Sequence, residues 1–341
     1  MALQHAEIVS LSKSVPETAI NGDEPPPPYV LKQSVFGSID VCPPNGPFPV
    51  IDISLLSPSS TASQAHVHKE LEKLRSALTS AGCIQVIGHG ISSSFLDKVR
   101  ELGKQFFELP MEEKQKYERP TNQIEGYGSN MIVSENQILD WSDRLSLWVF
   151  PQDTRNLHFW PQNPTGFRAN AVQGNRKVTK FGREQLLEYD RRESASAPRF
   201  NFYPLCSRPD LVLGVKPHTD RGGITILLQD KEVEGLQVRV DGKWFKVPII
   251  PDALVINLGD QMQIMSNGIF KSPLHRVVTN TEKLRMSVAV VSEAVVDKEI
   301  GAMEGLVNEE RPRLYNNVKN FGAVAYESYQ NEQIAMDAIK A

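Results

Sequence analysis

The chain has 341 residues, of which 40% are hydrophobic and 23% charged, so its composition allows a sizeable globular core. Its 37 basic and 41 acidic residues give a net charge of −4, without a Lys/Arg cluster, which argues against nucleic acid or an anionic membrane as a main partner. We expect no membrane span and no secretory signal, because no apolar run has the required length or flanks. The three cysteines lack a CxxC spacing, which favours free thiols and a cytoplasmic location.

Residues 1–47 are expected to form a flexible, poorly packed arm, in which the proline run 25–28 reads as a stiff extended linker. Two amphipathic helices should follow, each recognised by apolar residues at helical spacing. The serine cluster 92–94 is predicted to cap the second helix. In chain order, the predicted elements are a short strand at 49–54, a helix carrying Leu71, Leu74, Leu78 and Ala81 and ending at Gly82, a buried strand at 83–87, and a helix carrying Phe95, Val99, Leu102 and Phe106 and ending near Leu109.

From Phe200 to about Val291 the apolar period changes to two, which is typical of strands. Asp241-Gly242 lies between two such runs and is the strongest short hairpin signal in the chain. Two further strands are predicted at 253–258 and 261–265, and a C-terminal helix at 326–341. Many short strands with tight turns favour a sandwich or barrel of the jelly-roll type.

The segment Lys216-Pro-His-Thr-Asp220 carries the first chemical signal. In a strand, His218 and Asp220 point to the same face, and His275 could supply a third ligand. Two histidines and one carboxylate form the facial triad of non-haem Fe(II) oxygenases, which leaves three metal positions open. Taken alone, His-x-Asp is a weak signal that also fits a surface turn, and a lone His275 more often satisfies its hydrogen bonds inside a core.

Arg285 and Ser287 follow His275 across a turn, at an even offset that can place all three inside one barrel. An arginine pairs with a carboxylate through two parallel hydrogen bonds, and a serine hydroxyl can add another. A metal together with a deep arginine is what 2-oxoglutarate requires, since its oxo-acid end chelates iron while its far carboxylate meets the guanidinium. An ordinary surface salt bridge is the alternative for Arg285.

With these residues in place, the sequence resembles the plant soluble 2-oxoglutarate/Fe(II)-dependent dioxygenases. The resemblance is strongest to the branch of specialised metabolism that includes hydroxylases, O-demethylases and norcoclaurine-synthase-like proteins. It covers most of residues 48–168 and 199–335. The motifs that carry it are Pro49–Asp52, His89-Gly90, Asn201–Pro204, Leu211–Val215, Ile224–Asp230, Gly235–Val238, Asn257–Asp260, Ser266–Gly268 and Arg311–Tyr315.

The resemblance implies roles for individual residues. His218, Asp220 and His275 would bind Fe(II), whereas the cosubstrate 2-oxoglutarate would be held by Arg285, Ser287, Tyr203 and Asn201. Glu125–Gly128 and the Trp141 region would border the substrate cavity, although an aromatic helix-packing patch is an equally good interpretation of them. The reaction would consume O2 and release succinate and CO2, with ascorbate helping to keep the iron reduced.

The predicted fold is α+β with a mainly β core: a double-stranded β-helix (jelly roll) with an N-terminal helical domain and a C-terminal helix. The predicted function is hydroxylation or O-demethylation of a small aromatic or alkaloid-like metabolite by a cytoplasmic monomer that binds neither nucleic acid nor membrane. The expected divisions are an arm at 1–47, a helical domain at 48–168, a connector at 169–198, the jelly-roll domain at 199–295 and a C-terminal extension at 296–341.

One segment departs from the family. Residues 169–197 are charge-rich and shorter than usual, only Leu186, Leu187 and Tyr189 hint at helical spacing, and no long packed helix is predicted there. An altered or mispredicted splice junction is one hypothesis for this segment. It also motivates a second candidate function, a catalytically impaired ligand-binding protein of the same fold. A third candidate is an oxidase of this fold that uses ascorbate in place of 2-oxoglutarate.

Overall fold

The computed structural model describes most of the chain, with side chains throughout except at 179–185 and 194. The described residues are 15, 19, 24–31, 37–57, 60–120, 123–129, 137–185, 194–294, 298–331 and 333–341. No helix among them is long and apolar enough to cross a membrane.

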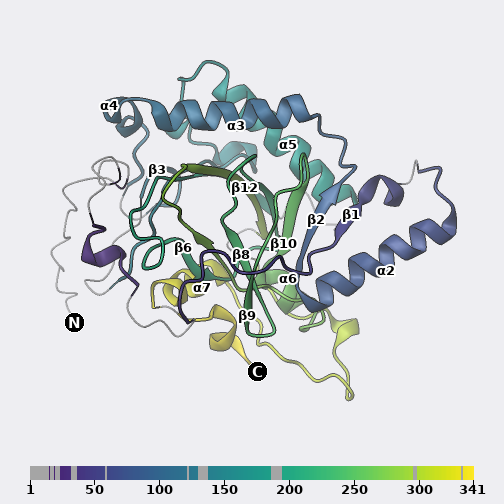
Figure 1. Cartoon of the computed structure of the whole chain (residues 1–341). Helices are drawn as coiled ribbons and strands as arrows, with labels where there is room; N and C mark the ends of the chain where they lie inside the picture. The colour runs from purple at the N-terminus through teal and green to yellow at the C-terminus, as the bar shows by residue number, and fades with distance from the viewer. Residues whose placement is uncertain are drawn as a thin grey trace.

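Two β-sheets form the centre of the molecule (Figure 1). The large, eight-stranded sheet has the order β1 (Val50–Asp52), β2 (Cys83–Ile87), β10 (Leu254–Leu258), β7 (Ile224–Leu228), β12 (Arg285–Ala294), β5 (Ser194–Tyr203), β4 (Asp143–Ser146) and β3 (Gly126–Gly128). The small, four-stranded sheet has the order β6 (Leu213–His218), β11 (His275–Val278), β8 (Leu236–Val240) and β9 (Lys243–Lys246). This is the predicted double-stranded β-helix.

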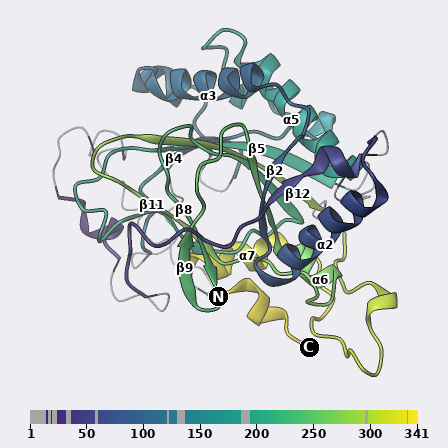
Figure 2. The same ribbon diagram turned by 45° about the vertical axis from the view of Figure 1, so that its right-hand side comes forward.

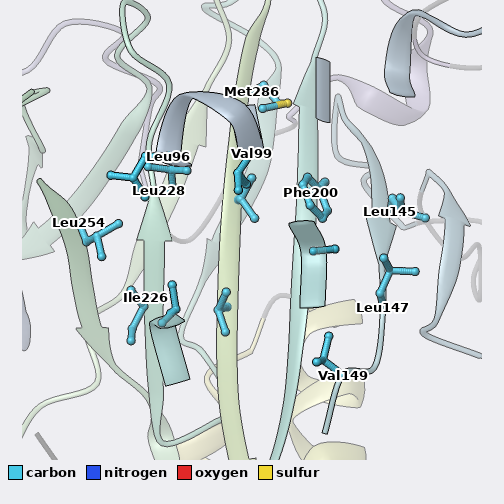
Figure 3. Close-up of a cluster of buried hydrophobic side chains, with 14 of the residues drawn as sticks. Leu96, Val99, Leu145, Leu147, Val149, Phe200, Ile226, Leu228, Leu254 and Met286 are labelled. Carbon is cyan, nitrogen blue, oxygen red and sulfur yellow. The ribbon is translucent and has the colours of Figure 1, made fainter. Parts of the chain in front are cut away.

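The outer face of the large sheet is covered by two helices, α3 (Ser93–Glu108) and α5 (Phe167–Gln185), which both lie along the same side of the barrel in Figures 1 and 2. Figure 3 shows Leu96 and Val99 of α3 among the side chains of the sheet, with Ile226 of β7, Phe200 of β5 and Met286 of β12 around them. All five side chains are buried in one apolar cluster. Removing this much apolar surface from water supplies a large share of the driving force for folding.

The alternate residues of the same strands point the other way, between the two sheets. Leu227 and Val255 of the large sheet share a buried cluster with Leu236 and Val238 of the small sheet. Ala289 of β12 packs against this cluster. Because side chains alternate along a strand, the residues two and four positions from Ala289 also face the small sheet. That inner face carries the site described below.

Several predicted elements are confirmed. The first two helices are α2 (Gln64–Ser80), which contacts β1 and β2, and α3, although Ser92 at the start of α3 makes no capping hydrogen bond from its side chain. β8 and β9 form the predicted hairpin, in which Asp241 and Gly242 both have positive φ, at 47° and 79°.

Two predicted elements are wrong in type or extent. The strand predicted at 261–265 is the helix α6 (Asp260–Met265), because its first backbone N–H groups donate to the carbonyls of Asp220 and Gly222 rather than to a neighbouring strand. The single helix predicted at 326–341 is instead α7 (Phe321–Gln330) followed by a 3-10 turn at Ala335–Ile339. One more short helix, α4, spans Met111–Gln115.

The segment for which no packed helix was predicted contains α5, a helix of 19 residues. Phe167, Ala171 and Val178 are buried on one face, and Phe167 packs against Phe200 with ring centroids 5.0 Å apart. This apolar face was missed in the sequence because only a few residues of a helix have to be apolar for one face to pack, and the rest of the segment is rich in charge. The hints at 186, 187 and 189 lie outside the described residues, and β5 then begins at Ser194, within the predicted connector.

The described part of residues 1–47 is also better packed than predicted. Pro27–Tyr29 is a 3-10 turn rather than an extended linker, and Tyr29 is buried edge-on against Trp141, with ring centroids 5.0 Å apart. The backbone N–H of Leu31 donates to the carbonyl of Leu211, and that of Lys246 donates to Pro44. The aromatic contact and these backbone bonds attach the segment to the barrel.

Candidate active site

The three predicted metal ligands meet at one end of the small sheet. His218 ends β6, His275 begins β11, and the two residues are direct partners in the antiparallel ladder. Asp220 follows β6 by two residues, and its Oδ1 lies 3.6 Å from His218 Nε2 and 3.7 Å from His275 Nε2. The ligand atoms of all three residues lie within 4.8 Å of one another. A set of two imidazoles and one carboxylate suits a divalent iron ion with open positions.

Backbone carbonyls orient both imidazole rings. Nδ1 of His218 lies 2.8 Å from the carbonyl oxygen of Lys216, and Nδ1 of His275 lies 3.0 Å from that of Pro273. A carbonyl can only accept, so each Nδ1 carries the proton and each Nε2 has a free lone pair directed at Asp220. Burial, and then the charge of His218, lower the pKa of His275 to about 4, which keeps this ring in the neutral form that binds metals.

The second oxygen of the Asp220 carboxylate is held by two polar side chains. Asn257 Nδ2 on β10 donates to Oδ2 at 2.8 Å, and the Thr225 hydroxyl donates to the same oxygen. Burial by itself would raise the pKa of Asp220, but its electrostatic interactions with His275 and His218 and the hydrogen bond from Thr225 outweigh burial and hold the pKa below its usual range. Asp220 therefore stays ionised with Oδ1 left for a cation.

Arg285 lies on the inner face of the large sheet with an unusual lack of partners. Its side chain is 1% exposed, and its Nε donates to the carbonyl of Val233 at 3.2 Å. Neither terminal nitrogen has a hydrogen-bond partner among the described residues. Leaving charged N–H groups buried without acceptors costs free energy, so this guanidinium is ready to bind a carboxylate through two parallel hydrogen bonds.

The other residues predicted to hold the cosubstrate surround Arg285. Tyr203 on β5 is the cross-strand partner of Arg285 on β12, and Asn201 on β5 is the cross-strand partner of Ser287. All four side chains belong to the inward-facing positions of β5 and β12. The guanidinium carbon of Arg285 lies 5.1 Å from the centre of the Tyr203 ring. The structure thus brings the three predicted metal ligands and the four predicted cosubstrate residues into the barrel interior, with the metal group at the small sheet and the arginine group on the large sheet.

A cavity of about 210 Å³ opens beside the metal group. It is lined by His218 and Asp220, and also by Glu125. The rest of the predicted segment, 126–128, does not line it, and Tyr127 is buried in the apolar core. Trp141 does not line it, because Trp141 is buried against Tyr29 and donates its indole N–H to the carbonyl of Leu205.

Several residues at this site were not identified as site residues from the sequence. The period-two alternation Arg199, Asn201, Tyr203 could have indicated that Arg199 faces inward, but nothing marked its neighbours. Those found only in the structure are Arg119, Arg144, Arg199 and Tyr329, which line the cavity, and Asn257, which holds Asp220.

Comparisons with known proteins agree with this geometry. Residues 194–293 match the model of the 2OG-Fe(II) oxygenase superfamily, and residues 48–163 match the model described as non-haem dioxygenase in morphine synthesis, N-terminal. The chain is 39% identical to Protein SRG1 of Arabidopsis thaliana over 77% of this chain and 76% of that protein. It is 38% identical to codeine O-demethylase of Papaver somniferum over 78% of this chain and 77% of that enzyme. This chain belongs to the 2OG-Fe(II) oxygenase superfamily.

This oxygenase also has close structural relatives. A crystal structure of JOX2 in complex with 2OG, Fe and JA superposes with a TM-score of 0.80 and 29% identity, covering 94% of each chain. The oxygenase is accordingly an oxidoreductase whose cofactor is Fe(II) and whose cosubstrate is 2-oxoglutarate, and the unpaired ligand atoms and the unpaired Arg285 both suit those two groups.

Proposed function

We propose that the oxygenase hydroxylates or O-demethylates a small aromatic or alkaloid-like metabolite, releasing succinate and CO2. The proposal is carried by one observation, the unpaired Arg285 in the same barrel interior as the group of His218, Asp220 and His275. When bound, Fe(II) and 2-oxoglutarate together activate O2, so that one oxygen atom enters a substrate C–H bond and the other enters succinate.

In this proposal the side chains position and shield the reactants. His218, Asp220 and His275 would hold the iron through Nε2, Oδ1 and Nε2. Arg285 and Ser287, with the Tyr203 phenol, bind the distal carboxylate of 2-oxoglutarate, and Asn201 helps to orient it. The residues around the cavity bind the substrate beside the metal and limit the access of water.

The reason for considering a catalytically impaired ligand-binding protein no longer holds. It rested on a large sheet left uncovered at 169–197, whereas α5 packs on β5, β7 and β12. We also propose, from the three free cysteines, that the oxygenase works in the cytoplasm, and that it works there as a monomer. Light scattering of the purified protein would test the monomer, and a dimer mass would contradict it.

The first test is to mix the protein anaerobically with Fe(II) and 2-oxoglutarate and to record the visible charge-transfer band of the chelate. We expect the band in the wild type and in Arg239→Met, a control on β8 outside the site, and a much weaker band in Arg285→Met. A wild-type band that Arg285→Met leaves unchanged would contradict the role of Arg285. Folded wild-type protein without a band would contradict the assembled site.

The metal ligands are tested separately by turnover. His218→Ala should abolish 2-oxoglutarate consumption while leaving the circular dichroism spectrum and the unfolding midpoint close to those of the wild type. Wild-type activity in His218→Ala would remove His218 from the metal site.

A further inference from the structure

Strand β5 connects the cosubstrate site to the cavity through side chains on one face. Arg199, Asn201 and Tyr203 occupy alternate positions, so they face the barrel interior together. Asn201 pairs with Ser287 on one side and with Arg144 of β4 on the other. Arg144 and Arg199 both line the cavity that also contains His218 and Asp220. Positive side chains therefore border the cavity beside the metal group, separately from Arg285.

Arg119, Arg144 and Arg199 form a group that we call the arginine cluster. Arg119 and Arg144 both direct Nη2 at the carbonyl oxygen of Ser129, and the longer of these two hydrogen bonds, from Arg144, measures 3.4 Å. The Nε of Arg199 and the Nε of Arg144 are both buried without a hydrogen-bond partner among the described residues. Across the described ranges, no carboxylate lies within ion-pair distance of the cluster.

Burial and the mutual repulsion of the three guanidinium groups lower the pKa values of Arg119 and Arg199. Burial, and then the charges of Arg144 and Arg199, lower the pKa of Arg119 to about 9. Burial and the charge of Arg144 also lower the pKa of Arg199. Like charges gathered in a partly desolvated site are unfavourable unless an anion offsets them.

The nearest acidic side chains are already engaged with other groups. Asp143 accepts hydrogen bonds from Tyr127 at 2.6 Å and from the Ser129 hydroxyl. Asp140 accepts from Tyr329 at 2.6 Å and lies 3.9 Å from the ammonium of Lys216. Glu125 lines the cavity, but it accepts the backbone N–H of Trp148 at 2.9 Å, and burial raises its pKa.

A fourth cavity arginine shows the contrast. Arg221 donates to both carboxylate oxygens of Glu293, at 2.8 Å each, and both residues line the same cavity. That arginine is neutralised by the protein in a bidentate pair. The arginine cluster has no such bidentate partner within the described part of the chain, and the charges of Asp140 and Asp143 act on it only from beyond ion-pair distance. Its unpaired N–H groups are therefore available to a ligand.

We propose that the arginine cluster binds the carboxylate of a small organic acid, and that this acid is the substrate of the oxygenase. Arg144 and Arg199 hold the carboxylate, and Arg119 adds to the positive field. The rest of the cavity wall includes Ile124, Leu147, Val215 and Val291, which fit a compact apolar body next to the metal group. The identification of the acid as substrate rests on the proposed function. Within the metabolites covered by that function, it selects acids over protonated amines.

The test uses isothermal titration calorimetry with sets of three probes that share one shape and differ in charge. Each set contains an acid, its primary amide and the corresponding amine: 4-methoxyphenylacetate, 3-(4-methoxyphenyl)propionate and cyclohexylacetate with their amides and amines. The titrations are run on metal-free protein and on protein loaded anaerobically with Fe(II) and 2-oxoglutarate. Because the metal-free titration does not depend on iron, the inference and the proposed function can fail independently.

We expect at least one acid to bind about tenfold or more tightly than its amide and its amine, as charge-assisted pairing with arginine predicts. Arg144→Met should abolish that preference, and Arg144→Lys should restore part of it. The control is Arg155→Met, because Arg155 has a terminal nitrogen without a partner among the described residues but does not line the cavity. That control should leave the preference unchanged.

Equal binding of acid and amide across all sets, or a preference that survives in Arg144→Met, would overturn the inference. A preference that Arg144→Met abolishes, in protein that gives no charge-transfer band, would support the anion site but overturn the proposed function. A charge-transfer band in protein that shows no preference for the acid would support the proposed function but overturn the anion site.

Discussion

Asn257 donates a hydrogen bond from Nδ2 to Oδ2 of Asp220 at 2.8 Å, and so links β10 of the large sheet to the metal group. This bond fixes the carboxylate so that its other oxygen, Oδ1, faces both histidines. Hydrogen bonds to metal ligands orient those ligands and tune metal affinity.

Replacing Asn257 by Leu should therefore weaken Fe(II) binding by about 10- to 100-fold, the usual loss when a residue that orients a ligand is removed. Anaerobic calorimetric titration of the metal measures this directly. Asn316→Leu is the matched control, since Asn316 is an exposed asparagine that bonds to the carbonyl of Lys340. An Asn257→Leu dissociation constant within about twofold of the wild type would show that Thr225 alone suffices to hold Asp220.

Arg285→Met should separate stability from cosubstrate binding. Removing two unpaired charged nitrogens from a buried site should make the cosubstrate-free protein about 1 kcal/mol more stable, despite the lost bond to Val233. 2-Oxoglutarate at a hundred times its dissociation constant should stabilise the wild type by about 2.7 kcal/mol. At the same concentration it should not stabilise the variant. Urea unfolding with and without 2-oxoglutarate measures both effects, and an equal increase in both proteins would contradict the assignment.

Gly235 lies against Arg285 closely enough to control its position. A Cβ at residue 235 would lie 2.8 Å from Cδ and 3.0 Å from Nε of Arg285. Gly235→Ala should therefore displace the guanidinium and weaken 2-oxoglutarate binding by about tenfold, although no charge changes. Gly305→Ala, where the added methyl group meets no atom within 4 Å, is the control and should bind normally. Unchanged 2-oxoglutarate affinity in Gly235→Ala would show that the arginine can shift without loss.

Phe167→Ala tests whether α5 covers the large sheet. Phe167 is 1% exposed and its ring contacts those of Phe106 and Phe200, so its truncation should cost about 3–5 kcal/mol of unfolding free energy. Leu157, which is 57% exposed, is the control, and Leu157→Ala should change stability by less than about 0.5 kcal/mol. Chemical denaturation measures both, and similar small losses would mean that the helix is not packed on the barrel.

The sequence by itself determined the features that depend on residues close together in the chain. His218 and Asp220 are two residues apart on an extended segment, so their common orientation follows from strand geometry alone. The Asp241-Gly242 turn is equally local, because both residues must adopt positive φ. The period-two pattern around these residues, with its many short strands and tight turns, was enough to predict a sandwich or barrel of the jelly-roll type.

The tertiary structure decided what depends on distant partners. Residues 261–265 are a helix because Asp220 and Gly222 accept the first N–H groups of that segment, and no local pattern reveals such acceptors. α5 is recognisable only from the sheet that its few apolar residues meet. Arg144 and Arg199 are far apart in the chain and meet because β4 pairs with β5 beside the metal group. Arg119 joins them because its backbone N–H donates to Tyr127 of β3, which pairs with β4. Pairing between strands that are distant in the chain creates this proximity, and no regular spacing of these residues in the sequence predicts it.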